Sequence, residues 1–149
     1  MSTSSWDRIV NDRRADILVL WQEKGLELFE EKMAPHTPLA EGLRDAMDMV
    51  LEGFVADDET CREGISGISR ILAVQPLRPS RSLLLFRELG AILHTMGPGD
   101  ADRDECDRRI EEMIFQAFDS FIEHREKIYQ LKVEESRSRV AMLLRRHAS

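Results

Sequence analysis

Apolar residues recur along this chain at intervals of three and four, the spacing of one face of an α-helix. The pattern is cleanest between residues 39 and 54, where the opposite face carries Asp45, Asp48 and Glu52. The apolar face of this stretch consists of Leu39, Leu43, Ala46, Met47, Val50, Leu51 and Phe54. This division into two faces predicts an amphipathic helix that buries one side in a protein core.

The same spacing, with the breaks between apolar stretches, predicts five helical segments. Pro35 and Pro38 separate the first two, with Thr37 in the N-cap position and Pro38 in the first helical position. Gly97-Pro98-Gly99 ends the fourth. The five segments cover about 6–32, 38–54, 58–74, 80–96 and 104–146.

Two glycines, Gly64 and Gly67, interrupt the third segment. A glycine inside a helix costs about 1 kcal/mol relative to alanine. We therefore expect a neighbouring helix to approach closely at these positions.

The segments predict an all-α, bundle-like single domain of five or more helices spanning residues 1–149. β-branched residues are scattered and no hairpin turn links alternating runs, so strands are not expected. The last segment exceeds the length that one small core can cover. We expect a compact core over about 6–122 and a helix over about 123–147 that projects, breaks or packs on a second copy. The predicted dimer seam consists of Phe121, Ile128, Leu131 and Val140.

Charge and hydropathy exclude some classes of partner. The net charge of −7 and the pI near 5.2 argue against nucleic acid, which needs a basic surface. No apolar stretch is long enough to span a membrane, and the N-terminus does not resemble a signal peptide, so a cytoplasmic location is expected. The basic end formed by Arg137, Arg139, Arg145 and Arg146 either stabilises a helix C-terminus or contacts an acidic partner or a membrane surface.

The motifs of common enzymes are missing. The sequence has no phosphate-binding glycine loop, nucleophile elbow or zinc helix, so we expect no enzymatic activity, metal or cofactor. His94 and His124 lie beside apolar stripes, and the alternative is a sensor that binds haem, a tetrapyrrole or a lipid-like molecule. Their structural interpretation is a partly buried histidine bonded to a carbonyl or carboxylate. Cys61 and Cys106 are interpreted as buried, reduced thiols, with a redox-sensitive thiol as the alternative.

A distinctive segment covers residues 68–83, with the sequence ISRILAVQPLRPSRSL. One predicted helix ends with Arg70 and Ala73-Val74-Gln75, and the next begins with Pro79-Ser80. This segment resembles the R-x-R-A-V-Q … P-S signature in the N-terminal domain of RsbR/RsbRD-type co-antagonists, the stressosome proteins. Leu72 occupies the position of the second arginine of that signature. The resemblance spans about residues 16–96, and the last helix matches only by type.

The resemblance implies a globin-like helical fold that binds no haem, forms dimers and serves as a sensory or scaffolding input. In that family the last helix leads into a STAS domain that carries phosphorylated threonines. This sequence ends at Ser149 without such a domain, so the phosphorylation switch is not carried over. The expectation is therefore a stand-alone, homodimeric sensor or adaptor with a regulatory protein partner.

The same segment has a structural interpretation. Pro79 disfavours the helical conformation for Arg78 and fixes a corner between two helices. Ser80 is suited to cap the free N–H groups at the start of the fourth predicted helix. Arg70 and Gln75 are suited to bond the free carbonyls at the end of the third. The alternative assigns Arg70, Gln75, Arg78 and Ser80 to contact with a ligand or partner. The sequence leaves both open.

Overall fold

A computed structural model describes residues 5–29, 34–54, 58–97 and 103–148. Within these ranges the chain is helical and contains no strand, which confirms the predicted all-α fold class. The helices are α1 (Ser5–Asp12), α2 (Arg14–Leu26), α3 (Pro38–Glu52), α4 (Glu59–Ala73), α5 (Pro79–Met96) and α6 (Arg103–Ala148). None of these helices is long and apolar enough to cross a membrane.

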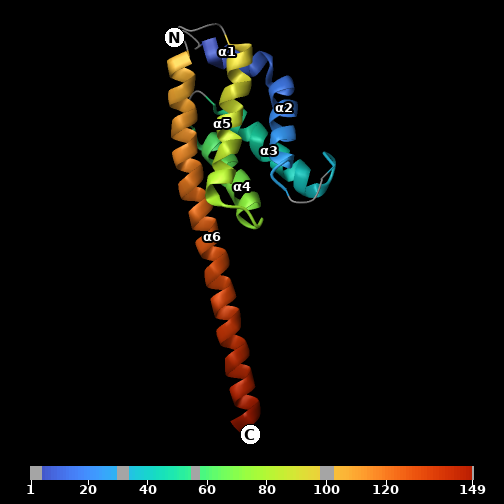
Figure 1. Cartoon of the computed structure of the whole chain (residues 1–149), viewed down its shortest axis with the longest axis vertical. Helices are drawn as coiled ribbons and strands as arrows, with labels where there is room; N and C mark the ends of the chain where they lie inside the picture. The colour runs from blue at the N-terminus through green and yellow to red at the C-terminus, as the bar shows by residue number, and fades with distance from the viewer. Residues whose placement is uncertain (1–4, 30–33, 55–57, 98–102, 149) are drawn as a thin grey trace.

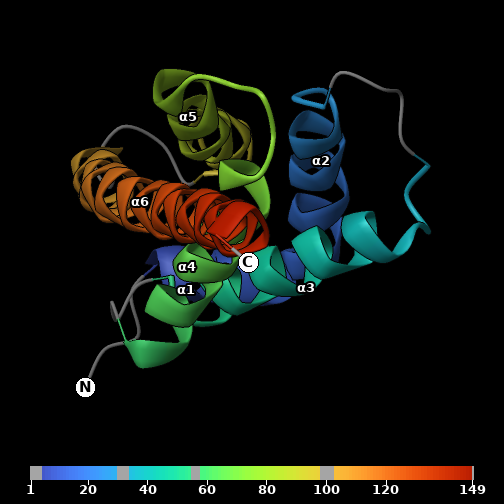
Figure 2. The same cartoon turned by 90° about the horizontal axis from the view of Figure 1, so that it is seen from below.

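Five shorter helices gather around the first half of α6, and the second half of α6 extends away from them (Figure 1). α3 packs on α4, and both α4 and α5 pack on α6. α2 contacts α3 and α5, which places it on the side of the domain away from α6 (Figure 2). The largest fully buried side chains include Trp6, Trp21, Phe86 and Phe121. Trp21 and Phe86 pack edge to face with ring centroids 5.9 Å apart, and burial of the four aromatic side chains stabilises the domain.

The first predicted segment is two helices rather than one. Arg13 separates α1 from α2, with φ −113° and ψ 19°, outside the helical region. The two helices bury different residues, Trp6 and Val10 from α1 and Ile17 and Trp21 from α2. At 3.6 residues per turn these four positions share one helix face, so the apolar periodicity continues across the break at Arg13 and predicts one helix where the chain forms two. α2 also ends at Leu26, before the predicted limit at residue 32, and residues 30–32 lie outside the described part.

Helix starts follow the predicted local chemistry. Thr37 is the N-cap of α3, and its Oγ1 accepts a hydrogen bond from the Ala40 N–H at 3.3 Å. Pro38 occupies the first turn, as expected. Asp58 caps α4 in the same way, accepting from the Cys61 N–H at 3.0 Å. Satisfying the free N–H groups at these ends stabilises both helices.

The glycines of α4 lie against α3, as their spacing predicted. A Cβ on Gly64 would lie 2.6 Å from the Ala46 carbonyl oxygen and 2.8 Å from the Val50 nitrogen. At Gly67 the nearest atom would be the Cβ of Ala46, at 3.1 Å. Gly64 therefore sets how closely α3 and α4 approach, because a side chain there would meet backbone atoms.

The last helix runs without a break for 46 residues, about 69 Å at 1.5 Å per residue. Its last buried residue is Phe121, and every residue from Glu134 to Ala148 is exposed. An isolated helix in water is only marginally stable, and packing of an apolar face supplies most helical stability in proteins. Beyond Val133, α6 has no such packing against the described part of the chain.

Candidate functional site

Arg125 of α6 holds the corner between α4 and α5. Its Nε donates to the Ala73 carbonyl at 2.7 Å, and its Nη2 donates to the carbonyls of Gln75 and Leu77 at 2.8 and 2.7 Å. The guanidinium carbon also lies 4.6 Å from the ring centroid of Phe121. These contacts satisfy carbonyls that the end of α4 leaves free and join the corner to α6.

Arg125, rather than Arg70, bonds these carbonyls, whereas Gln75 does bond the end of α4 as predicted, its backbone N–H donating to the Leu72 carbonyl at 3.0 Å. The N-cap assignment of Ser80 is also wrong. The N-cap residue of α5 is Arg78, whose side chain makes no capping bond, and Ser80 lies exposed in the first turn. The effect predicted for Pro79 is confirmed, since Arg78 is extended with φ −75° and ψ 149°.

A hollow of about 830 Å³ lies beside this corner. We call it the corner hollow, and it is lined by residues 73–78 and by Arg125, Ile128 and Lys132. Two of the predicted contact residues, Gln75 and Arg78, lie in it. Arg70 lines a different hollow, between α3 and α4, and Ser80 lines neither. The corner hollow therefore contains two of the four predicted contact residues together with Arg125 and Lys132 of α6, which the sequence analysis did not identify.

A second candidate surface runs along α6, on the face turned away from the domain. We call it the outer stripe, and it consists of Phe115, Phe118, Ile122, Tyr129, Val133, Val140, Leu143 and Leu144. At 3.6 residues per turn these positions share one face of the helix. Six of the eight are exposed, Val133 is partly buried, and Ile122 is partly buried against the core, so the stripe borders the domain at that position.

The predicted dimer seam mixes two faces of α6. Phe121 is 0% exposed and belongs to the core, and Ile128 is partly buried against it, so neither forms a free seam in this chain. Leu131 is exposed but continues that core-facing side of the helix. Val140 lies nine residues, or two and a half turns, beyond Leu131 and therefore on the opposite face. Of the four predicted residues, only Val140 belongs to the outer stripe.

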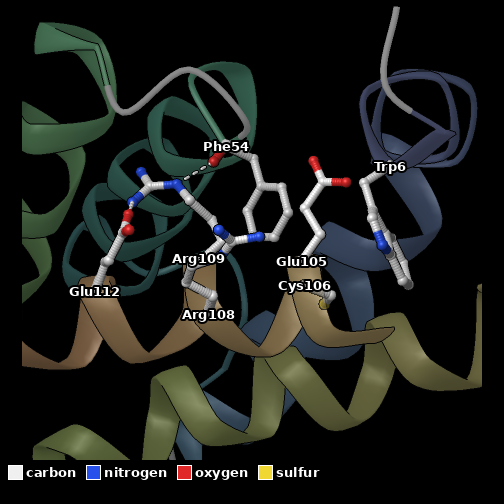
Figure 3. A pocket seen from close by; sticks show the side chains of 7 residues that line it. All are labelled: Trp6, Phe54, Glu105, Cys106, Arg108, Arg109 and Glu112. Atoms are coloured by element: carbon white, nitrogen blue, oxygen red, sulfur yellow. Dashed lines mark hydrogen bonds and ion pairs between the residues drawn. The ribbon is translucent and has the colours of Figure 1, made fainter. Parts of the chain in front are cut away.

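A smaller pocket of about 250 Å³ lies where α6 begins, beside α1 and the end of α3 (Figure 3). Arg109, which is buried, donates through Nε to the Phe54 carbonyl and through Nη2 to the Cys61 sulfur at 3.1 Å. Its Nη1 lies 3.2 Å from a Glu112 carboxylate oxygen. These bonds tie α6 to the end of α3 and the start of α4. These contacts indicate a structural role for Arg109.

Both cysteines are buried and reduced, as interpreted from the sequence. Burial chiefly, together with the nearby carboxylates of Asp107 and Glu105, raises the pKa of the Cys106 thiol to about 12. A thiol with this pKa is protonated at neutral pH and is a weak nucleophile. This property does not favour the redox-sensitive alternative for Cys106.

The two helix histidines have polar partners. The Nε2 of His94 lies 2.7 Å from an Asp107 carboxylate oxygen, and the Nε2 of His124 lies 3.2 Å from the Ser66 hydroxyl. Both fit the structural interpretation better than that of a haem ligand. Among the described residues, no group of three or more His, Cys, Asp or Glu side chains is arranged to hold a metal ion.

His124 is expected to make stability depend on pH. Burial chiefly, with the charges of Lys127 and Arg70, lowers its pKa below the ordinary value of 6.5. The unfolded chain therefore binds a proton first as the pH falls. The stabilisation from neutral His124 is complete above pH 6.5 and is lost as the pH falls through the folded pKa. Urea unfolding of wild type and His124→Gln between about pH 7 and pH 5 should show the steeper loss in the wild type. Equal slopes would contradict the assignment.

A distant relative of this chain occurs in an archaeon. An uncharacterized protein of Archaeoglobus fulgidus is 28% identical over 107 residues, which cover 70% of this chain and 71% of the archaeal protein. No protein-family model matches the chain, and no solved structure matches it. The relative's name assigns no activity, so a functional argument depends on the surfaces described above.

Proposed function

We propose that this protein is a non-enzymatic signalling domain, a sensor or adaptor that acts as a homodimer through the outer stripe. The observation that carries the proposal is the length of this apolar surface. It extends from Phe115 on the domain to Leu144 on the projecting half of α6. Contiguous exposed apolar surfaces of this kind mark interfaces in proteins. A partner packed along the stripe would also stabilise the projecting end of α6, where the described residues from Glu134 onward are exposed.

The charges of α6 favour an antiparallel pair. Residues 103–126 contain eight acidic and four basic side chains, whereas residues 127–148 contain two acidic and six basic ones. In an antiparallel pair the basic half of one copy lies against the acidic half of the other. A parallel pair would place like charges together, which is unfavourable across an interface.

The regulatory role is supported by the resemblance of residues 68–83 to RsbR/RsbRD-type domains, which act as dimeric inputs to a stress response. On this basis we place the proposed dimer in the cytoplasm, with a regulatory protein as its partner. The alternative, a sensor for haem or a lipid-like molecule, gains no support from His94 and His124, because each is engaged by a neighbouring side chain.

Charged residues in the outer stripe are expected to separate the dimer. The double variant Tyr129→Glu/Val140→Glu places a carboxylate at two exposed stripe positions. Burying these charges in an apolar seam should raise the dissociation constant by about 100-fold or more. Sedimentation velocity over a dilution series measures this change.

The matched control is Leu131→Glu/Met142→Glu, which adds the same charge at exposed positions on the opposite side of α6. It should remain dimeric at concentrations where the stripe variant is monomeric. If both variants or neither dissociate, the stripe is not the interface.

Orientation is testable with a nitroxide label on Ala141→Cys, an exposed position beside the stripe. The native cysteines are buried and should not react. In an antiparallel pair centred on the stripe, the two labels should lie about 35 Å apart, from the rise of 1.5 Å per residue. Pulsed electron paramagnetic resonance measures this separation. A distance below roughly 20 Å would indicate parallel helices packed side by side.

A further inference from the structure

The corner hollow has a charge opposite to that of the protein. Arg78, Arg125 and Lys132 line it, and none of its described lining residues is acidic, although the whole chain carries a net charge of −7. Arg78 and Lys132 are exposed, whereas Arg125 is held by the corner carbonyls. Two exposed cations thus share this surface with one cation that is held in place by hydrogen bonds.

The start of α5 adds to this positive field. Arg78 is the N-cap residue, the first turn contains no acidic side chain, and Arg81 lies exposed within it. The N-terminus of a helix carries a partial positive charge and attracts anions. In α3 and α4 the corresponding position is occupied by Thr37 and Asp58, whose side-chain oxygens already accept from the helix N–H groups.

Apolar surface lies between the cations. Val74 is 61% exposed, and Pro76, Leu77 and Ile128 also line the hollow. A ligand that fits this surface therefore combines negative charge with apolar groups. A phosphate ion would satisfy the cations and leave the apolar part unused.

The shape of the hollow indicates the kind of ligand. Sites for small molecules enclose most of the ligand surface. This hollow is bounded on one side by a turn and on the other by α6, and several of its side chains are exposed. Nucleic acid binding would need a longer basic surface than three cations provide.

We propose that the corner hollow binds an acidic, apolar peptide segment of a partner protein. Carboxylates of the segment pair with Arg78 and Lys132, and an apolar side chain packs on Val74 and Ile128. The proposal goes beyond the homodimer and does not depend on it. Because Arg125 joins the corner to α6, a peptide here contacts the domain at the point where the helix leaves it.

The test uses the full chain, labelled with ¹⁵N, and a synthetic peptide that alternates pairs of glutamate and leucine. Titration should shift the amide signals of residues 73–78 and 125–132. Two further probes are a peptide with glutamine in place of each glutamate, and inorganic phosphate. Each should bind at least about tenfold more weakly than the acidic peptide. The glutamine peptide loses the charge-assisted contacts, and phosphate loses the apolar contacts.

Two charge-reversal variants complete the design. Arg78→Glu/Lys132→Glu should weaken peptide binding by about tenfold or more and leave the dimer intact. Arg137→Glu/Arg145→Glu changes the net charge equally in the exposed basic end and should bind the peptide as the wild type does. No shifts with the acidic peptide would overturn the proposal. The proposal would also be overturned if the glutamine peptide or phosphate bound as tightly as the acidic peptide. A loss of peptide binding only in Arg137→Glu/Arg145→Glu would overturn it as well.

Discussion

Replacement of Arg125 by methionine should lower the free energy of unfolding by about 3 kcal/mol. The guanidinium bonds the carbonyls of Ala73, Gln75 and Leu77 and packs on Phe121. Hydrogen bonds to a charged group contribute about 1.5 to 3 kcal/mol each, and carbonyls left without a partner add a desolvation cost. Water reaches part of this site, so we expect the total to be well below the sum of three bonds. Methionine retains much of the apolar contact with Phe121 and isolates the loss of hydrogen bonding.

Chemical denaturation measures this loss, and Arg137→Met is its matched control. Arg137 is an exposed arginine of the same helix, so its replacement should change stability by less than about 0.5 kcal/mol. If the two variants unfold at the same denaturant concentration, Arg125 does not hold the corner. The proposed dimer would add to the measured stability, so both variants must be compared at one protein concentration.

Replacement of Gly64 by alanine should destabilise the protein by about 2 kcal/mol, although alanine favours the helix itself. The added methyl group would lie 2.6 Å from the Ala46 carbonyl and 2.8 Å from the Val50 nitrogen, so α3 and α4 must move apart. Overpacking of a core costs about 1 to 3 kcal/mol. Backbone atoms cannot move aside as the end of a side chain can, so we expect an overpacking cost of about 3 kcal/mol. The gain in helix propensity, about 1 kcal/mol, reduces the net loss to about 2 kcal/mol.

Gly67→Ala provides the comparison for this variant, because the glycine lies in the same helix at the same contact. Its new methyl group would lie 3.1 Å from the Cβ of Ala46, and a small shift relieves that contact. The gain in helix propensity, about 1 kcal/mol, should then leave this variant close to wild type. Thermal unfolding compares the two, and a Gly64→Ala protein as stable as Gly67→Ala would contradict the close packing of α3 and α4.

The helices could be predicted from the sequence where their ends are set by local chemistry. α3 begins at Pro38 after the Thr37 cap, as predicted, because both signals act within one turn. The kink at Arg13 has no such signal, since neither proline nor glycine lies there. The apolar spacing runs through it, because Trp6 and Trp21 share one helix face, so periodicity alone predicts a single helix there.

The candidate surfaces were predicted only in part for the same reason. Gln75 and Arg78 could be located from the 68–83 segment, but Arg125 lies 50 residues beyond Gln75 and looks like any charged residue of an amphipathic helix. The predicted dimer seam combined buried and exposed residues because α6 carries apolar residues on two faces. Periodicity groups residues by face, but it does not show which face the domain covers. The covered face includes Phe121, and the exposed one includes Val140.

The two proposed surfaces meet on one helix. The corner hollow uses Ile128 and Lys132, and the outer stripe passes through Tyr129 on a neighbouring face of α6. A peptide at the corner therefore leaves the stripe free for a second copy. This arrangement would allow a dimer to present two equivalent corners to its regulatory partner.

The most direct test of the central claim, a homodimer formed through α6, is sedimentation equilibrium of the unmodified chain over a range of micromolar concentrations. The account predicts a species of twice the chain mass of 17.2 kDa, and a single mass near 17.2 kDa for the Tyr129→Glu/Val140→Glu variant. A wild-type protein that stays at 17.2 kDa throughout the range would contradict the claim.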